Sequence, residues 1–160
     1  MIPAWIVRPF AAEDAPQLLD LMRALAVFEG YIDAFRVTEA DLLSFGLGPQ
    51  GRFGAVVAAE AASGRLLGMA VHYVIPWTYD MRPTLVLKEL FVAEDARGSG
   101  VGQGLMNAVI DEARRIGAPR IDWLVLAGNE AAMAFYRGLG GRQDDTWLRW
   151  RLDAEGDQHD

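Results

Sequence analysis

Residues 97–104 read Arg-Gly-Ser-Gly-Val-Gly-Gln-Gly, with a glycine at every second position and an arginine at the start. The stretch lies between a strand-like apolar run at 85–92 and a helix-like run at 105–116. A glycine-rich turn from a strand into a helix exposes backbone N–H groups at the positive end of that helix. The stretch therefore predicts a site for a phosphorylated ligand.

The spacing of these glycines excludes two common phosphate loops. A Walker loop needs Lys-Ser or Lys-Thr directly after its last glycine, and neither pair occurs here. A dinucleotide fingerprint needs glycine at the sixth position of G-x-G-x-x-G, and each of the three possible starts places another residue there. The residues do fit Arg-x-x-Gly-x-Gly, filled by Arg97, Gly100 and Gly102.

The composition narrows the class of protein. The 160 residues suit one domain, with 1–153 as the folded part and 154–160 as an acidic, flexible tail. The chain has no cysteine, which excludes disulfides, thiolate metal sites and a cysteine nucleophile. Its two histidines, His72 and His159, cannot build a metal cluster by themselves, so we expect no metal.

The net charge and the hydropathy of the chain indicate which classes of partner to expect. A net charge of −7 argues against a nucleic-acid partner, whose phosphates require clustered basic residues. The acidic surface either attracts a cationic substrate or only keeps the protein soluble. The chain shows no signal-peptide pattern at its start and no apolar run of membrane length. We therefore expect no membrane partner and a cytoplasmic location.

Hydrophobic periodicity predicts alternating strands and helices. Thr38-x-x-Asp41 resembles a capping box, and Asn129 suits the start of a helix. The order predicts a mixed α/β fold, with a central, mostly antiparallel sheet flanked by helices on both faces. The strands are expected at 2–8, 53–60, 66–75, 85–92, 121–126 and 147–152, and the helices at 12–28, 39–45, 105–116 and 130–139.

Leu90-Phe91-Val92 followed by the Arg-x-x-Gly-x-Gly residues resembles the acyl-CoA pyrophosphate loop of the GNAT N-acetyltransferases. The resemblance spans roughly residues 3–152 and implies a three-layer GNAT-like fold with acetyl-CoA as co-substrate. It implies that the pantetheine arm of acetyl-CoA adds to the strand backbone at Leu90, Phe91 and Val92. The implied diphosphate site consists of Arg97, Gly98, Ser99, Gly100, Val101 and Gly102.

Acetyl transfer to an amine needs a general base, because a protonated amine with a pKa of about 10.4 is not a nucleophile. Glu89 lies within an apolar strand just before the glycine loop, where burial would raise its pKa toward the useful range. The residues leave two interpretations open. Glu89 is either this base or a strand carboxylate paired with an arginine.

The segment from Asn129 through Phe135-Tyr136 to Leu139-Gly140 resembles the GNAT signature that follows the fifth strand. The resemblance implies that Tyr136 is the general acid that protonates the thioester sulfur, and that Asn129 helps to hold the pantetheine. Considered without the resemblance, a helix tyrosine usually packs half-buried and an asparagine usually only caps its helix.

The whole chain is similar to the diamine (spermidine/spermine) acetyltransferase-like branch of that family. In this branch, acidic residues at the positions of Glu29 and Asp80 help to receive a cationic substrate. The chain departs from the branch at Lys88-Glu89, where the polyamine enzymes carry glutamate and then aspartate. Lys88 would repel a dication in the same cleft and would suit an amine that also carries a carboxylate.

The expected activity is direct transfer of the acetyl group to a primary amine of a small molecule, either polyamine-like or amino-acid-like. Two alternatives stay open, namely acetylation of a protein N-terminus or lysine, and a CoA-binding regulatory module without turnover. The resemblance also implies a homodimer, formed around the last strand with Trp147 and Trp150.

Overall fold

The computed structural model describes residues 4–155. The chain divides into two compact units, and the boundary between them in the sequence lies between Leu124 and Val125. The strands are β1 (Trp5–Pro9), β2 (Gly54–Glu60), β3 (Leu66–Pro76), β4 (Pro83–Val92) and β5 (Ile121–Trp123). The α-helices are α1 (Ala15–Glu29), α2 (Glu39–Gly46), α3 (Val101–Ile116) and α4 (Glu130–Gly138). Short 3-10 turns are η1 (Ala12–Asp14), η2 (Ile32–Ala34) and η3 (Glu94–Ala96).

The five strands form one sheet, in which they lie in the order of the chain. Neighbours from β1 to β4 pair antiparallel, whereas β5 pairs parallel with β4. A parallel pair requires a long crossover, and α3 provides it. The expected mixed, mostly antiparallel sheet is confirmed.

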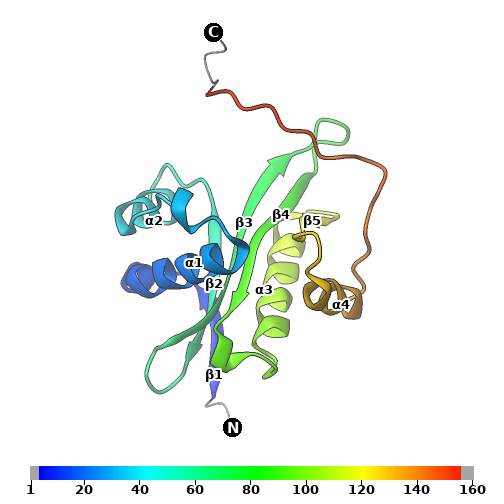
Figure 1. The fold of residues 1–160 in the computed structure, drawn as a ribbon. Helices are drawn as coiled ribbons and strands as arrows, with labels where there is room; N and C mark the ends of the chain where they lie inside the picture. Colours follow the sequence, from blue (N-terminus) through cyan, green and yellow to red (C-terminus); the bar gives the residue numbers. More distant parts are fainter. Residues whose placement is uncertain (1–3, 156–160) are drawn as a thin grey trace. The chain divides into compact units, whose positions relative to one another are not determined.

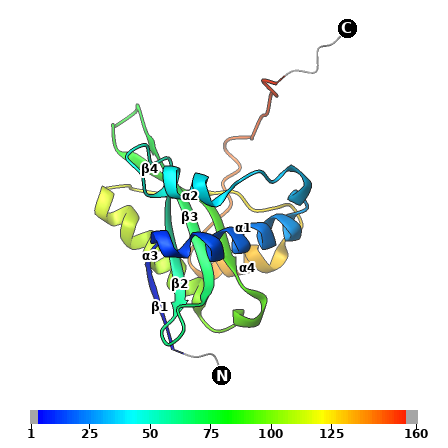
Figure 2. The same ribbon diagram turned by 90° about the vertical axis from the view of Figure 1, so that its left-hand side faces the viewer.

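Helices cover both faces of this sheet, as expected. Figure 1 shows α1 and α2 on one face and α3 on the other, and Figure 2 views the sheet from the α1 and α2 side. On β3, Met69 and Val71 belong to the core on the α1 face. Gly68, which directly precedes Met69, faces α3, because a Cβ there would lie 3.0 Å from the Leu105 side chain. Residues 66–72 of β3 are thus buried on both faces, whereas the end of the strand is exposed.

The helix after the glycine loop begins earlier than expected, at Val101 rather than at residue 105. Two glycines of this first turn have identifiable roles. Gly100 is the N-cap residue and has a φ of 88°, which favours glycine. A Cβ on Gly104 would lie 2.8 Å from the indole of Trp5, so this glycine lets β1 pack closely on α3.

The second unit differs from the expectation. The prediction of a strand at 147–152 is wrong, since these residues form no strand in the structure. Extended sequence forms a strand only where another strand edge pairs with its backbone. Among the described residues of this unit, α4 is the one regular element, so the unit offers no such edge. β5 is also shorter than the expected 121–126.

Residues 2 and 3 of the first expected strand lie outside the described residues, as do 156–160 of the expected tail. The single folded domain at 1–153 stays a prediction. Within residues 4–155, no helix has the length and apolar character needed to cross a membrane.

Candidate active site

The turn between β4 and α3 has the backbone of an anion site. Gly98 and Gly100 both adopt positive φ angles, 77° and 88°, where a side chain would be strained. The Ser99 hydroxyl donates a hydrogen bond to the Ala96 carbonyl within the turn. No side chain caps α3, and its first turn contains no acidic residue. The N–H groups of this turn therefore remain available to an anion, which the helix dipole favours.

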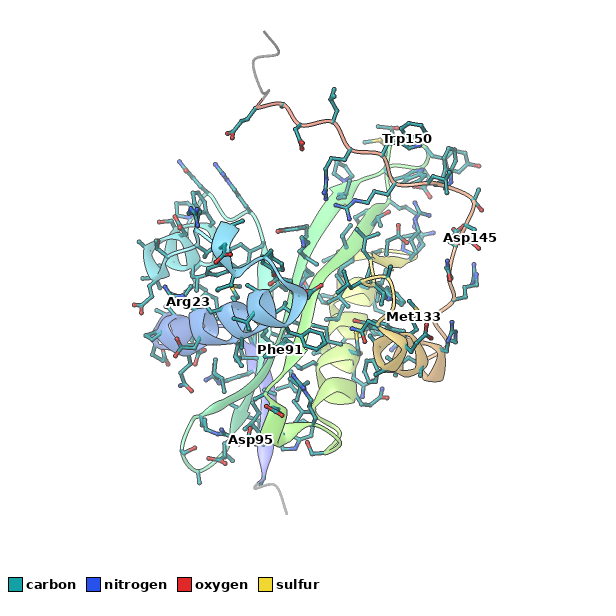
Figure 3. All side chains as sticks on the ribbon, in the orientation of Figure 1. Arg23, Phe91, Asp95, Met133, Asp145 and Trp150 are labelled. Atoms are coloured by element: carbon teal, nitrogen blue, oxygen red, sulfur yellow. The ribbon has the colours of Figure 1, made fainter. Side chains whose placement is uncertain are left out.

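Arg97, expected beside the same anion, lies toward α1. Its Nε donates to the Val92 carbonyl at 3.1 Å. The guanidinium carbon lies 5.5 Å from the ring centre of Phe91 and 6.0 Å from that of Phe28. Figure 3 labels Phe91, which packs into the core on the α1 face. The side chain thus lies on the face of β4 that α1 covers.

One edge of β4 is paired over only part of its length. β5 pairs with Leu85, Val86 and Leu87 and with no later residue of β4. In the part of the chain that the structure describes, no strand follows β5 along this edge. Backbone groups at Leu90 to Val92 can therefore bind an extended ligand that carries amides.

A β-bulge at Lys88 decides where Glu89 points. Across the β3–β4 pair, Glu89 lies opposite Val71, and Leu87 lies opposite His72, so Lys88 is the extra residue. Val71 belongs to the core on the α1 face. Residues directly opposite in an antiparallel pair share a face, so Glu89 faces α1. Bulges commonly re-aim a side chain in this way.

The surroundings of Glu89 suit a general base. Burial raises the pKa of this half-buried carboxyl, the nearby charge of Lys88 lowers it, and that of Glu29 raises it further. The net direction is upward. Among the ion pairs of residues 4–155, none involves Glu89, so the interpretation as an arginine-paired carboxylate finds no support.

Two tyrosines lie near Glu89 that the sequence reasoning missed. Burial, followed by the charges of Glu89 and Glu29, raises the pKa of Tyr31 to about 12. Burial and the charge of Glu89 also raise the pKa of Tyr73. Tyr73 could have been found, because it continues the α1-facing alternation of Met69 and Val71 along β3. Tyr31 follows the end of α1, and no sequence pattern links it to β4.

The three expected substrate-binding residues lie in different settings. Glu29 is the last residue of α1, and its charge affects Glu89. Lys88 is exposed at the bulge. Asp80 is exposed in the turn between β3 and β4, where its Oδ1 accepts a hydrogen bond from the Arg82 N–H at 3.0 Å. The charges of Glu29 and Lys88 therefore act on Glu89. Asp80 instead forms a hydrogen bond within its own turn.

The other two expected residues belong to the second unit. The side-chain oxygen of Asn129 accepts a hydrogen bond from the Ala132 N–H at 3.2 Å, so its expected role as a helix cap is confirmed. Tyr136 is half-buried on α4 and meets the ring of Phe135 edge to face, with ring centres 5.3 Å apart. Within residues 4–155, no cluster of three His, Cys, Asp or Glu side chains could hold a metal ion.

A groove of about 540 Å³ lies between α1 and the carboxyl end of β4. Apolar side chains form most of its wall, and Glu94 and Arg97 supply the charged groups. Phe28, which is 58% exposed, lies beside Arg97 in this groove. The complete lining is Leu21, Ala24, Val27, Phe28, Phe91, Ala93, Glu94 and Arg97.

Known proteins resemble this chain over most of its length. The model of the acetyltransferase (GNAT) family matches residues 17–140. The thialysine N-epsilon-acetyltransferase of Sus scrofa is 26% identical, over 94% of this chain and 93% of that protein. The human spermidine/spermine N(1)-acetyltransferase-like protein 1 is 28% identical over 93% of this chain, which spans only 22% of that longer protein.

The fold is also found among solved structures. An integron cassette protein from the mobile metagenome of V. cholerae superposes with a TM-score of 0.76 at 21% identity. The match covers 94% of this chain and 93% of that one. At this identity the likeness concerns the fold.

Proposed function

Since the chain belongs to the acetyltransferase (GNAT) family, we propose that it transfers the acetyl group of acetyl-CoA directly to a primary amine of a small molecule. The observation that carries this proposal is Glu89, a half-buried carboxyl with a raised pKa beside the unpaired edge of β4. A carboxyl with a raised pKa accepts a proton from an ammonium group more readily than an ordinary one.

The backbone of the first unit fits the parts of acetyl-CoA. The Arg97 guanidinium and the N–H groups at 98–102 are proposed to hold the diphosphate, because positive-φ glycines and an uncapped helix start expose those N–H groups. The free edge at Leu90, Phe91 and Val92 suits the pantetheine amides. Asn129 is proposed as a further pantetheine contact. Bound there, acetyl-CoA would supply an acetyl group already activated as a thioester.

Two side chains are proposed to move protons. The Glu89 carboxylate takes one from the ammonium group of the acceptor, directly or through a water molecule, and leaves a nucleophilic amine. The Tyr136 hydroxyl holds the proton that the leaving sulfur receives. Glu29 adds negative charge near Glu89 and thereby favours a cationic acceptor. Asp80 is proposed to contribute to the same attraction.

A second copy of the chain is the proposed partner. Trp147 and Trp150 are 84% and 89% exposed, which is unusual for tryptophan. A homodimer would cover them, and a dimer mass in analytical ultracentrifugation would support it. The cytoplasmic location stays a prediction.

The proposed activity predicts release of CoA thiol only when a small amine is present. We expect turnover with short primary amines, including diamines and ω-amino acids, and much weaker turnover with peptides that offer only a lysine side chain. A thiol reagent measures the release cleanly, because the protein contains no cysteine. Tight binding of acetyl-CoA without thiol release on any amine would instead favour a regulatory module.

Tyr136→Phe tests the proposed acid. We expect kcat to fall about tenfold, and no further, because a thiolate with an ordinary pKa of about 8.5 leaves without full protonation. Acetyl-CoA binding, measured by calorimetry, should persist. Phe135→Leu is the matched control on the same helix, since it removes the neighbouring ring and leaves the hydroxyl. Unchanged kcat in Tyr136→Phe would exclude the acid role.

A further inference from the structure

We propose that Thr84, Arg120 and Trp77 form a second anion site, which binds a carboxylate and is separate from the glycine-rich turn before α3. All three residues belong to the first unit. The first support is a pair of buried polar atoms. The Thr84 hydroxyl oxygen and Nη2 of Arg120 are both buried, and neither has a hydrogen-bond partner among residues 4–155. Thr84 as a whole is only 3% exposed.

The register of the sheet places these two side chains next to each other. β4 and β5 run parallel with Leu85 beside Ile121, and the Leu85 N–H donates a hydrogen bond to the Arg120 carbonyl at 3.4 Å. Continued by one residue, the same register places Thr84 beside Arg120. Residues beside each other on adjacent strands direct their side chains to the same face of the sheet. The hydroxyl and the guanidinium therefore share one face.

Trp77 holds the guanidinium of Arg120 in position. It directly follows β3, and its ring centre lies 4.0 Å from the guanidinium carbon, a distance at which a cation and an aromatic ring attract each other. Among the ion pairs within residues 4–155, none involves Arg120. A buried donor without an acceptor has lost its hydration and gained no hydrogen bond, which is costly. A ligand that supplies the acceptor removes this cost.

The donors select a carboxylate. The guanidinium nitrogens can only donate, and the Thr84 hydroxyl can donate as well. A carboxylate accepts from both and carries the charge that offsets the guanidinium. Asp122 lies two residues after Arg120 in alternation, and its charge opposes a dianion such as phosphate. Trp77 is 40% exposed, so an apolar group on the ligand can contact its ring.

The site is distinct from the proposed amine site. Thr84 and Glu89 are five residues apart on β4, which corresponds to roughly 15 Å along an extended strand. The carboxylate can therefore belong to a free small molecule or to the far end of a long acceptor. Both sources present the same chemistry to Thr84 and Arg120.

Thr84→Val tests the hydroxyl, because valine replaces it with a methyl group of similar size. Without ligand, this variant should unfold a few degrees higher than the wild-type protein, since it removes an unpartnered buried polar group. The same variant should bind phenylacetate about 10-fold more weakly, with Kd measured by NMR titration. A hydroxyl with a purely structural role would not combine these two effects. Lower stability of Thr84→Val without ligand would overturn the inference.

Arg120→Met tests the charge and keeps an apolar side chain beside Trp77. The Kd of phenylacetate should rise about 10-fold or more, and Arg120→Lys should restore part of the affinity. Phenylacetamide, which lacks the charge, should bind the wild-type protein as weakly as phenylacetate binds Arg120→Met. Arg23→Met, an exposed arginine of α1, is the matched control and should keep the wild-type Kd. Shifts that grow linearly with phenylacetate, or an unchanged Kd in Arg120→Met, would overturn the inference.

Inhibition of thiol release separates the two sources of the carboxylate. Phenylacetate should compete with the amine if the site holds the far end of an acceptor, and should not compete if the site binds a separate molecule. The binding measurements need no turnover. Failure of the proposed acetyl transfer would therefore leave the test of this site intact.

Discussion

Replacing Glu89 with glutamine should lower kcat by about 10²–10⁴-fold, the usual contribution of a general base. Glutamine keeps the shape of the side chain and its position opposite Val71, but it cannot accept the proton. Acetyl-CoA binding should be unchanged, because Glu89 is not among the residues proposed to hold it. The measurement is kcat by thiol release, together with calorimetric binding of acetyl-CoA.

The pH dependence makes this prediction specific. Burial raises the pKa of Glu89, so kcat of the wild-type protein should fall as the pH drops through that raised value. This acid limb should be absent in Glu89→Gln. Lys88→Met should move the limb to higher pH, because the charge of Lys88 lowers the pKa of Glu89. Glu29→Gln should move it to lower pH, because the charge of Glu29 raises that pKa.

The control for Glu89→Gln is a carboxylate that lies outside the proposed site. Glu39→Gln changes an exposed carboxylate at the start of α2, far from these interactions in the chain, and should leave both kcat and the acid limb unchanged. Near wild-type kcat in Glu89→Gln would show that Glu89 is a structural carboxylate and that the base lies elsewhere. An acid limb that persists in Glu89→Gln would lead to the same conclusion.

Local patterns predicted most of the fold. The capping box at α2 is confirmed in both directions, because the Asp41 N–H donates to the Thr38 hydroxyl at 3.2 Å and the Thr38 N–H donates to the Asp41 carboxylate at 2.9 Å. Such motifs close within one helical turn, so the residues that decide them are adjacent in the sequence. The glycine loop is of the same kind, since its positive φ angles require glycine at particular positions.

Features that depend on pairing between distant segments were not predictable in this way. Strict alternation along β4 would place Leu87, Glu89 and Phe91 on one face. The bulge at Lys88 turns Glu89 and Phe91 toward α1 and leaves Leu87 opposite His72 on the other face. The guanidinium of Arg97 also lies 6.0 Å from the ring centre of Phe28, a residue far earlier in the chain. The strand expected at 147–152 failed for the same reason, because propensity alone supplies no partner edge.

Replacing Asp14 with alanine should destabilise the protein by about 2–4 kcal/mol, because it breaks the most buried ion pair of the described residues. Both Asp14 carboxylate oxygens accept hydrogen bonds from Arg8, at 2.6 and 2.9 Å, and one also accepts from the Ala11 N–H at 2.8 Å. The Asp14 side chain is only 3% exposed. Its loss leaves the guanidinium and the N–H of the 3-10 turn without their acceptor. Thermal unfolding should occur roughly 5–15 °C lower.

The exposed ion pair between Arg65 and Asp95 supplies the matched control. Its N–O distance is 2.9 Å, but the two side chains are 47% and 64% exposed. Asp95→Ala should therefore cost about 1 kcal/mol or less. Equal losses from Asp14→Ala and Asp95→Ala would contradict the argument from burial.

The stabilisation by Asp14 should also depend on pH in a definite direction. The hydrogen bonds from Arg8 hold the pKa of Asp14 below its ordinary value of 3.8, so the ionised carboxylate favours the folded state. Its contribution should be complete above about pH 5 and should disappear as the pH falls through the lowered pKa. The difference in unfolding free energy between the wild-type protein and Asp14→Asn should accordingly shrink between about pH 5 and pH 3. Denaturant unfolding at several pH values measures this, and a difference that grew with acid would show that the ion pair is not its source.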